Sequence, residues 1–149
     1  MVVAVFGEKC TGKYELACAL RDAIPMQLYA GDCWLREGEA EAADRLRRLL
    51  LDRLSRAPHI VCVLRTRGEL DLIPPGAVRI RLTRDLERMK QILCGRMFGD
   101  ENPGAMRALE AEHGLYGGDA CDLSIHELDG DSTRGAVDWV RRRLGRQEA

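Results

Sequence analysis

Short apolar runs alternate along this chain with longer segments whose apolar residues recur every three or four positions. Most of the runs are rich in β-branched residues and end at a glycine, a proline or a charged residue, which is typical of strands. One run alternates apolar residues with arginines and predicts a strand with one polar face. The strands expected from these runs are Val2–Phe6, Met26–Tyr29, Ile60–Leu64, Val78–Leu82 and Leu123–Ile125.

The segments between these runs have the periodicity of amphipathic helices. The strongest is Glu39–Ser55, where leucines form one apolar stripe, acidic residues gather at the start and arginines at the end. The last helix is expected to begin with Asp131 or Ser132 as its N-cap. Because strands alternate with helices, the pattern predicts an α/β fold with a parallel sheet and right-handed crossovers. The expected helices are Lys13–Ala23, Glu39–Ser55, Asp85–Met97, Ala105–Glu112 and Ser132–Leu144.

The composition is that of an ordinary globular protein. Apolar residues make up 46% and charged residues 32% of the 149 positions, which suits one domain over residues 1–149. The net charge of -1 argues against a nucleic-acid-binding protein, including one that uses the arginine-rich end Val140–Arg146. No apolar run is long enough to span a bilayer and no signal peptide is visible, so we expect a cytoplasmic protein without a membrane partner. The oligomeric state stays open.

Neither the cysteines nor the histidines have the spacing of a metal site. The six cysteines contain no C-x-x-C pair, and without a secretion signal they are expected to be reduced thiols, most of them in the core. The three histidines, His59, His113 and His126, are scattered along the chain. The spacing therefore predicts no zinc site.

The segment GEKCTGKY, Gly7–Tyr14, has the spacing of a phosphate-binding loop. It follows an expected buried strand and opens an expected helix, so its backbone N–H groups could surround phosphate oxygens at the positive end of the helix dipole. The alternative is a plain strand-to-helix turn with two glycines. If the loop binds a nucleotide, the binding residues would be Gly7, Lys9, Cys10, Thr11, Gly12, Lys13 and Tyr14.

Lysine is rare in this chain, and the loop holds most of it. Only three of the 23 basic residues are lysines, and two of these, Lys9 and Lys13, lie in the loop. A lysine ammonium is a compact point charge that can reach phosphate oxygens, whereas an arginine guanidinium is a wide planar fork. The bias favours a chemical role for Lys13, which would reach the β- and γ-phosphates of a nucleotide.

Two features of the sequence depart from an active phosphate loop. Tyr14 stands where a Ser or Thr would offer Mg²⁺ its hydroxyl, and the strand Ile60–Leu64 runs into Arg65 instead of a metal-holding Asp. Mg²⁺ often keeps several waters and binds through substrate phosphates. It therefore stays a candidate cofactor beside ATP.

Beyond the loop, the chain resembles the nucleoside-monophosphate-kinase group of phosphate-loop proteins, and most closely the cytidylate-kinase-like family. The stretches that carry the likeness are GEKCTGKY, YAGDCWLRE (Tyr29–Glu37), IVCVLRTRG (Ile60–Gly68), and LTRDLERMKQIL followed by CDLSIHELDGDS. The resemblance implies a five-stranded parallel sheet of order 2-3-1-4-5 with helices on both faces. It also implies a mobile lid at about residues 96–119.

The same resemblance implies roles for particular side chains. Lys13, Arg88 and Arg96 would act in catalysis, while Asp32, Arg36 and Arg67 would hold the acceptor. Arg107 would contact the acceptor side from the lid. Each arginine could instead be an ordinary surface residue of an arginine-rich chain.

Two functions of different classes follow from these observations. The first is an ATP-binding kinase that transfers a γ-phosphoryl group to a nucleotide or another small acceptor. The second is a catalytically degenerate relative that binds nucleotide or phosphate and acts as a sensor or a partner-binding protein. Lys13 and the lid arginines favour the enzyme, whereas Tyr14 and the missing metal Asp favour the binding module.

Overall fold

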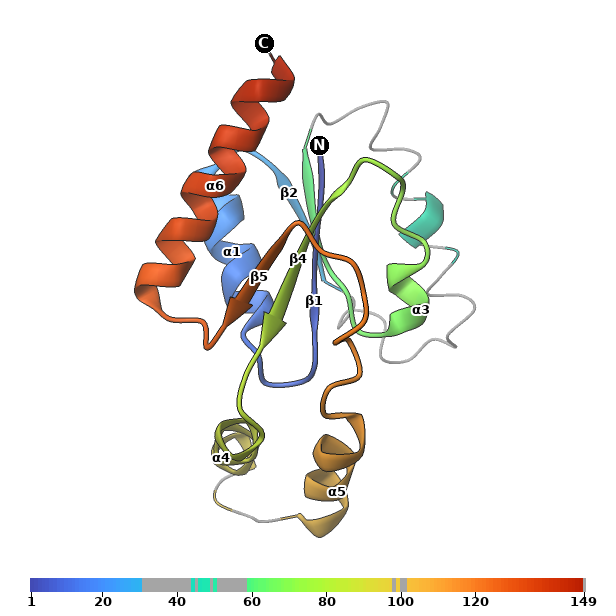
Figure 1. Cartoon of the computed structure of the whole chain (residues 1–149), viewed down its shortest axis with the longest axis vertical. Helices are drawn as coiled ribbons and strands as arrows, with labels where there is room; N and C mark the ends of the chain where they lie inside the picture. The colour runs from blue at the N-terminus through green and yellow to red at the C-terminus, as the bar shows by residue number, and fades with distance from the viewer. Residues whose placement is uncertain are drawn as a thin grey trace.

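Five parallel strands form one sheet in the order β2-β3-β1-β4-β5 (Figure 1). The computed structural model describes residues 1–30, 44, 46–48, 50, 59–97, 99 and 102–148. The strands are β1 (Val2–Gly7), β2 (Gln27–Ala30), β3 (Ile60–Val63), β4 (Val78–Thr83) and β5 (Leu123–His126). This confirms the predicted α/β class, the parallel sheet and the strand order.

Helices flank the sheet on both faces, as expected. They are α1 (Lys13–Ala23), α3 (Arg67–Leu70), α4 (Leu86–Arg96), α5 (Pro103–Glu112) and α6 (Gly130–Glu148). Within the helix expected at Glu39–Ser55, residues 44, 46–48 and 50 are described and are helical, and the others lie outside the described residues. Among the residues that the structure describes, no helix is both long and apolar enough to cross a membrane.

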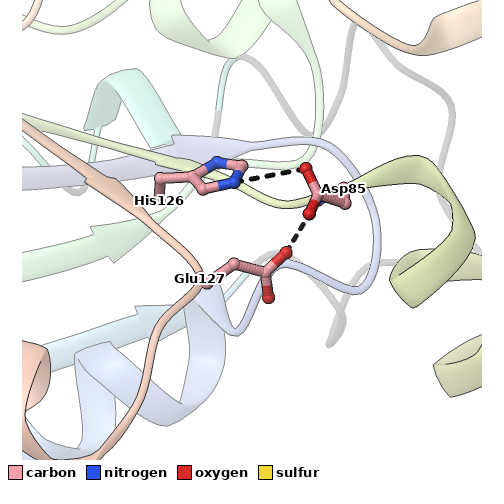
Figure 2. Close-up of side chains that lie close together, drawn as sticks. All are labelled: Asp85, His126 and Glu127. Carbon is pink, nitrogen blue, oxygen red and sulfur yellow. Dashed lines mark hydrogen bonds and ion pairs between the residues drawn. The ribbon is translucent and has the colours of Figure 1, made fainter.

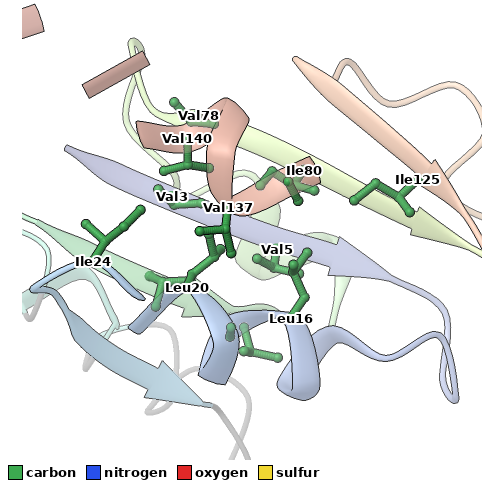
Figure 3. Packing of buried hydrophobic residues seen from close by; sticks show 14 of the residues in the cluster. Val3, Val5, Leu16, Leu20, Ile24, Val78, Ile80, Ile125, Val137 and Val140 are labelled. Carbon is green, nitrogen blue, oxygen red and sulfur yellow. The ribbon is translucent and has the colours of Figure 1, made fainter. Parts of the chain in front are cut away.

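One face of the sheet is covered by the first and the last helix. In Figure 3, Leu16 and Leu20 of α1 lie against Val5 of β1. Val137 and Val140 of α6 belong to the same buried cluster, so the two ends of the chain share one core layer. Burying each such aliphatic side chain stabilises the fold by about 1.5–3 kcal/mol.

The other face of the sheet carries a second buried cluster. Val2, Ala4 and Phe6 alternate along β1 with the residues that face α1, and they pack with Leu70 and Tyr116, among others. The rings of Phe6 and Tyr116 lie 5.6 Å apart at 58° to each other. All six residues of β1 are buried, which is why its sequence is uniformly apolar and shows no alternation.

One helix was missed and two local expectations were wrong. The helix α3 was not predicted, because a four-residue helix has no apolar period; Thr66 caps it by accepting a hydrogen bond from the Glu69 N–H at 3.2 Å. The N-cap contacts at the start of α6 come from Asp129, whose Oδ1 accepts from Ser132 N at 2.7 Å. Of the described cysteines, only Cys10 and Cys62 are buried.

The carboxyl ends of the strands meet at one edge of the sheet, and α4 and α5 lie beyond that edge (Figure 1). In an open parallel sheet this is the edge at which ligands bind. The loop between β1 and α1 lies at the same edge, since it follows the central strand.

Candidate phosphate-binding site

The loop between β1 and α1 has the backbone shape that the glycine spacing predicts. Cys10 and Gly12 adopt positive φ angles of 62° and 92°, so the chain turns sharply before α1 begins at Lys13. Gly12 is the N-cap residue of α1, and no side chain that the structure describes caps this end of the helix. The first N–H groups of a helix have no partner within the helix. This end of α1 therefore suits an anion.

Lys13 brings a positive charge to the same place. Its Nζ donates to the carbonyl oxygen of Gly7 at 2.9 Å and to that of Leu64 at 3.1 Å. Gly7 is the last residue of β1, and Leu64 directly follows the neighbouring strand β3. The ammonium therefore lies at the ligand-binding edge of the sheet, beside the loop.

The loop is held in shape by contacts with the rest of the protein. The Thr11 hydroxyl is fully buried and donates to the Glu8 carbonyl at 2.8 Å. The Arg84 guanidinium donates to the Cys10 carbonyl at 2.7 Å. The side chain of Cys10 is buried with Met89, among other apolar side chains of α4 and α5. These contacts fix the loop from several sides, and a preformed loop binds a ligand at a lower ordering cost.

A cleft of about 650 Å³ opens beside the loop. Its walls come from the loop, from the segment after β3 and from the end of α5 with the turn that follows it. Its lining residues are Gly7, Glu8, Lys9, Arg65, Thr66, Arg67, Gly68, Glu112, Leu115 and Tyr116. A cleft of this volume is of the size that takes a small molecule.

The charged groups in the cleft are partly paired. Arg67 donates to Asp119 Oδ1 at 3.0 Å. Arg65 forms an ion pair with Glu69 at 3.4 Å, and its backbone N–H donates to the other oxygen of that carboxylate at 3.0 Å. Lys9 is exposed at the rim. The cleft therefore presents three cationic side chains to a ligand.

A carboxylate joins the phosphate loop to the segment after α5. The Glu8 side chain is only 7% exposed, and its oxygens lie 3.2 Å from His113 Nδ1 and 3.2 Å from the backbone nitrogen of Gly114, which donates to it. The expected lid region therefore contacts the loop directly. Whether this region is mobile stays a prediction.

The structure brings together only some of the residues expected at the site. The seven loop residues, Gly7 and Lys9–Tyr14, lie together between β1 and the first turn of α1, and Arg67 lines the cleft. Arg96 approaches the loop, with one guanidinium nitrogen 3.7 Å from Cys10 Sγ and another 3.8 Å from Glu15 Oε1. Arg88 and Arg107 are exposed on α4 and α5 and do not line the cleft. Asp32 and Arg36 lie outside the described residues.

Three contacts at the site were not anticipated. They are the Arg84 clamp on Cys10, the contact of Glu8 with His113, and the position of Arg65 in the cleft. Arg84 directly follows β4, and Arg65 comes two positions after Val63, the last residue of β3. A basic residue just past a parallel strand is thus a signal that could have been used, because such residues gather at the binding edge.

Mg²⁺ does not find its usual protein ligands among the described residues of this loop. Tyr14 is 49% exposed and carries its oxygen at the far end of a ring. Thr11 commits its hydroxyl to the Glu8 carbonyl, and the Glu69 carboxylate is taken by Arg65. A divalent ion at the loop would have to be held by phosphate oxygens and water.

Comparison with known proteins bears on the fold. No protein-family model matches the chain, and no curated protein matches its sequence significantly. Solved structures do match. A gluconokinase from Sinorhizobium meliloti has a TM-score of 0.65 and 14% identity, with 99% of this chain and 97% of that chain covered. A sugar kinase from a Janibacter species has a TM-score of 0.65 and 16% identity, with 94% of each chain covered, and a shikimate kinase from Acinetobacter baumannii in complex with shikimate has a TM-score of 0.63 and 15% identity, with 98% of this chain and 93% of that chain covered. The chain therefore has the fold of phosphate-loop kinases.

Proposed function

We propose that this protein is a kinase that transfers the γ-phosphoryl group of ATP to a small anionic acceptor. The observation that carries the proposal is the position of Lys13 at the start of α1, where its Nζ donates to the carbonyl oxygen of Gly7, a residue that lines a cleft together with cationic side chains. A donor site and an acceptor site must lie next to each other for direct transfer, and this arrangement supplies both.

The donor would bind along the loop. Its phosphates would accept hydrogen bonds from the N–H groups of Cys10–Lys13, where the helix dipole favours negative charge. Lys13 would turn from the carbonyls of Gly7 and Leu64 toward the β- and γ-phosphate oxygens. This exchange is favourable because phosphate oxygens carry negative charge and attract the ammonium by a Coulomb interaction that neutral carbonyl oxygens lack.

The acceptor would occupy the cleft. Lys9, Arg65 and Arg67 outnumber the two carboxylates in its lining, Glu8 and Glu112, so an anionic group on the acceptor is favoured. Nucleoside monophosphates, expected from the cytidylate-kinase-like resemblance, and hydroxy acids both meet this requirement. Asp32 and Arg36 stay candidates for further acceptor contacts.

Catalysis would consist of positioning and charge neutralisation, as phosphoryl transfer requires. The attacking oxygen is a hydroxyl of a hydroxy acid or a phosphate oxygen of a nucleoside monophosphate; it forms a bond to the γ-phosphorus as the bond to the β,γ-bridging oxygen breaks and ADP leaves. A hydroxyl acceptor also gives its proton to a nearby base or water. Arg96 would steady the charge on the transferring group, a role supported by its guanidinium lying beside Cys10 of the loop. Arg88 and Arg107 would need α4 and α5 to shift before they could take part.

The second candidate is a nucleotide-binding module without turnover. Tyr14 at the metal position favours it, as does the absence of a metal-holding carboxylate after β3 among the described residues. Such a module would still bind ATP through the loop and Lys13. It would not need an acceptor.

Two measurements separate these candidates. The first is the shift in unfolding temperature with ATP for wild type, for Lys13→Ala, and for Arg21→Ala as a control that removes an exposed cation from the same helix. A ligand that binds the folded state raises its stability, so we expect a shift in wild type and in Arg21→Ala and its loss in Lys13→Ala. The second is ADP release with nucleoside monophosphates, gluconate and shikimate as acceptors.

The outcomes have distinct meanings. Acceptor-dependent ADP release that Lys13→Ala abolishes supports the kinase. An ATP shift with no turnover on any acceptor, and no change in the shift when acceptors are added, supports the module. Equal behaviour of wild type and Lys13→Ala rules out a phosphate site at the loop.

A further inference from the structure

A group of three potential metal ligands lies at the carboxyl ends of β4 and β5, apart from the cleft. Strand residues Thr83 and His126 are register partners, so the residues that follow them emerge side by side. Asp85 begins the turn into α4 and Glu127 follows β5 directly. The ligand atoms of Asp85, His126 and Glu127 all lie within 4.8 Å of one another (Figure 2).

The distances within this group are close to those of a coordination shell. His126 Nε2 lies 3.3 Å from Asp85 Oδ1. Ligand atoms about 2.1 Å from a metal are separated by roughly 3.0–3.4 Å in octahedral or tetrahedral geometry. This ligand pair therefore already has the required spacing, and the Glu127 carboxylate, within 4.8 Å of both, is near enough to complete the group.

A residue outside the group orients the imidazole. Thr83 Oγ1 lies 3.0 Å from His126 Nδ1. Because a hydroxyl can accept as well as donate, it can accept a hydrogen bond from Nδ1–H, which leaves the Nε2 lone pair facing the two carboxylates. Metal-binding histidines in proteins are held in this way by a partner on the other ring nitrogen.

The Glu127 carboxylate is likewise held in place. Its Oε1 accepts a hydrogen bond from the Asp85 backbone N–H at 2.8 Å, and its Oε2 forms an ion pair with Arg84 Nε at 3.2 Å. Glu127 adopts a φ of 58°, a conformation uncommon for a residue other than glycine. Each carboxylate oxygen keeps a second lone pair for a further ligand. Since two carboxylates face each other, a cation between them would relieve their repulsion.

We propose that Asp85, His126 and Glu127 form a binding site for a divalent first-row transition metal such as Co²⁺ or Zn²⁺. One imidazole nitrogen with two carboxylate oxygens is a donor set for these ions, and water would fill the open positions. Mg²⁺ prefers an all-oxygen shell and is disfavoured here by the imidazole. The site does not depend on the kinase proposal, and the histidine spacing could not predict it because Asp85 comes from another strand end.

The test uses the full chain without a histidine tag and follows the ring protons of its three histidines by NMR during Co²⁺ titration. The paramagnetic ion should broaden or shift the His126 signals at substoichiometric Co²⁺, before those of His59 and His113. Calorimetry with Co²⁺ gives the affinity. Subtracting the Co²⁺ titration of His126→Asn from that of wild type removes any contribution from Co²⁺ bound by the cysteine thiols.

His113→Asn is the matched control, because His113 lies 3.2 Å from one carboxylate, that of Glu8, and belongs to no group of three potential metal ligands among the described residues. We expect His126→Asn to abolish the one-to-one binding event. Asp85→Asn, Glu127→Gln and Thr83→Val should each weaken it by on the order of tenfold or more. His113→Asn should leave the affinity unchanged. If all three histidines respond alike, or if the event survives in His126→Asn, the site does not exist; circular dichroism of each variant without metal confirms that it is folded.

Discussion

Gly7 ends the central strand at a point where the structure leaves no room for a side chain. A Cβ atom there would lie 2.4 Å from the carbonyl oxygen of Leu82 and 3.2 Å from Thr11 Oγ1. The first of these atoms belongs to the backbone of β4 and cannot rotate away. Gly7 also adopts a φ of 154°, which other residues rarely do. The substitution Gly7→Ala should therefore force β1, β4 or the phosphate loop to move.

The expected cost combines two terms. A strained backbone conformation costs about 1–3 kcal/mol, and overpacking a well-filled site costs about 1–3 kcal/mol more. The sum, roughly 2–6 kcal/mol, is a large part of the 5–15 kcal/mol that stabilises a typical protein. For a chain of this length, each kcal/mol lowers the unfolding temperature by about 2–4 °C, so a drop of roughly 5–20 °C is expected.

The assay is thermal and urea unfolding followed by circular dichroism, with Gly95→Ala as the control. Gly95 lies within α4, and a Cβ there would meet nothing within 4 Å. Alanine is a better helix former than glycine by about 1 kcal/mol, so this variant should be as stable as wild type or slightly more stable. A Gly7→Ala variant that unfolds within about 0.5 kcal/mol of wild type would refute the close approach of the loop to β4.

Three further predictions concern the loop, the segment after α5 and one buried thiol. Tyr14→Ser should raise the dependence of ATP affinity on Mg²⁺, measured by calorimetry with and without the ion; a strong Mg²⁺ effect in wild type that Tyr14→Ser leaves unchanged would contradict the role given to this position. His113→Ala removes a contact of the buried Glu8 carboxylate, so hydrogen exchange over residues 103–119 should speed up while the strands are unaffected; equal exchange in both proteins would show that the contact does not hold the segment. Burial, with a smaller contribution from the Glu69 carboxylate, raises the pKa of the Cys62 thiol from 9.0 to about 12. Between these pH values the thiol is deprotonated in the unfolded chain but not in the folded one, so the free energy of unfolding should fall as the pH rises. A Cys62→Ala variant whose free energy of unfolding falls equally with pH would exclude Cys62 as the cause.

The fold could be predicted because each strand carries a local signal. A fully buried strand such as β1 is uniformly apolar, and the half-buried β4 alternates strictly, so both patterns survive without knowledge of their neighbours. The four-residue helix α3 has no such signal, since its cap and its packing come from the turn around Thr66. Its existence depends on tertiary contacts that no periodicity reports.

The candidate site divides in the same way. The phosphate loop is a contiguous motif, and its glycine and lysine positions follow from local backbone and charge requirements. The contact between Glu8 and His113 joins residues more than a hundred positions apart, and the Asp85–His126 pair joins two strand ends. Such pairs form only once the strand order is set, so a single sequence gives no spacing by which to find them.

Arg84 connects the phosphate loop with the group Asp85, His126 and Glu127, the two parts of the sheet edge for which separate ligands are proposed. Its guanidinium donates to the Cys10 carbonyl in the phosphate loop and to the Leu128 carbonyl at 3.4 Å, and its Nε pairs with Glu127. This side chain is largely buried, so neither partner can be replaced freely by water. A metal bound by Glu127 would share this carboxylate with Arg84, and a phosphate at the loop would lie near the Cys10 peptide that the same guanidinium contacts. Any effect of one ligand on the affinity of the other must be reciprocal, which makes Arg84 the residue through which such coupling would pass.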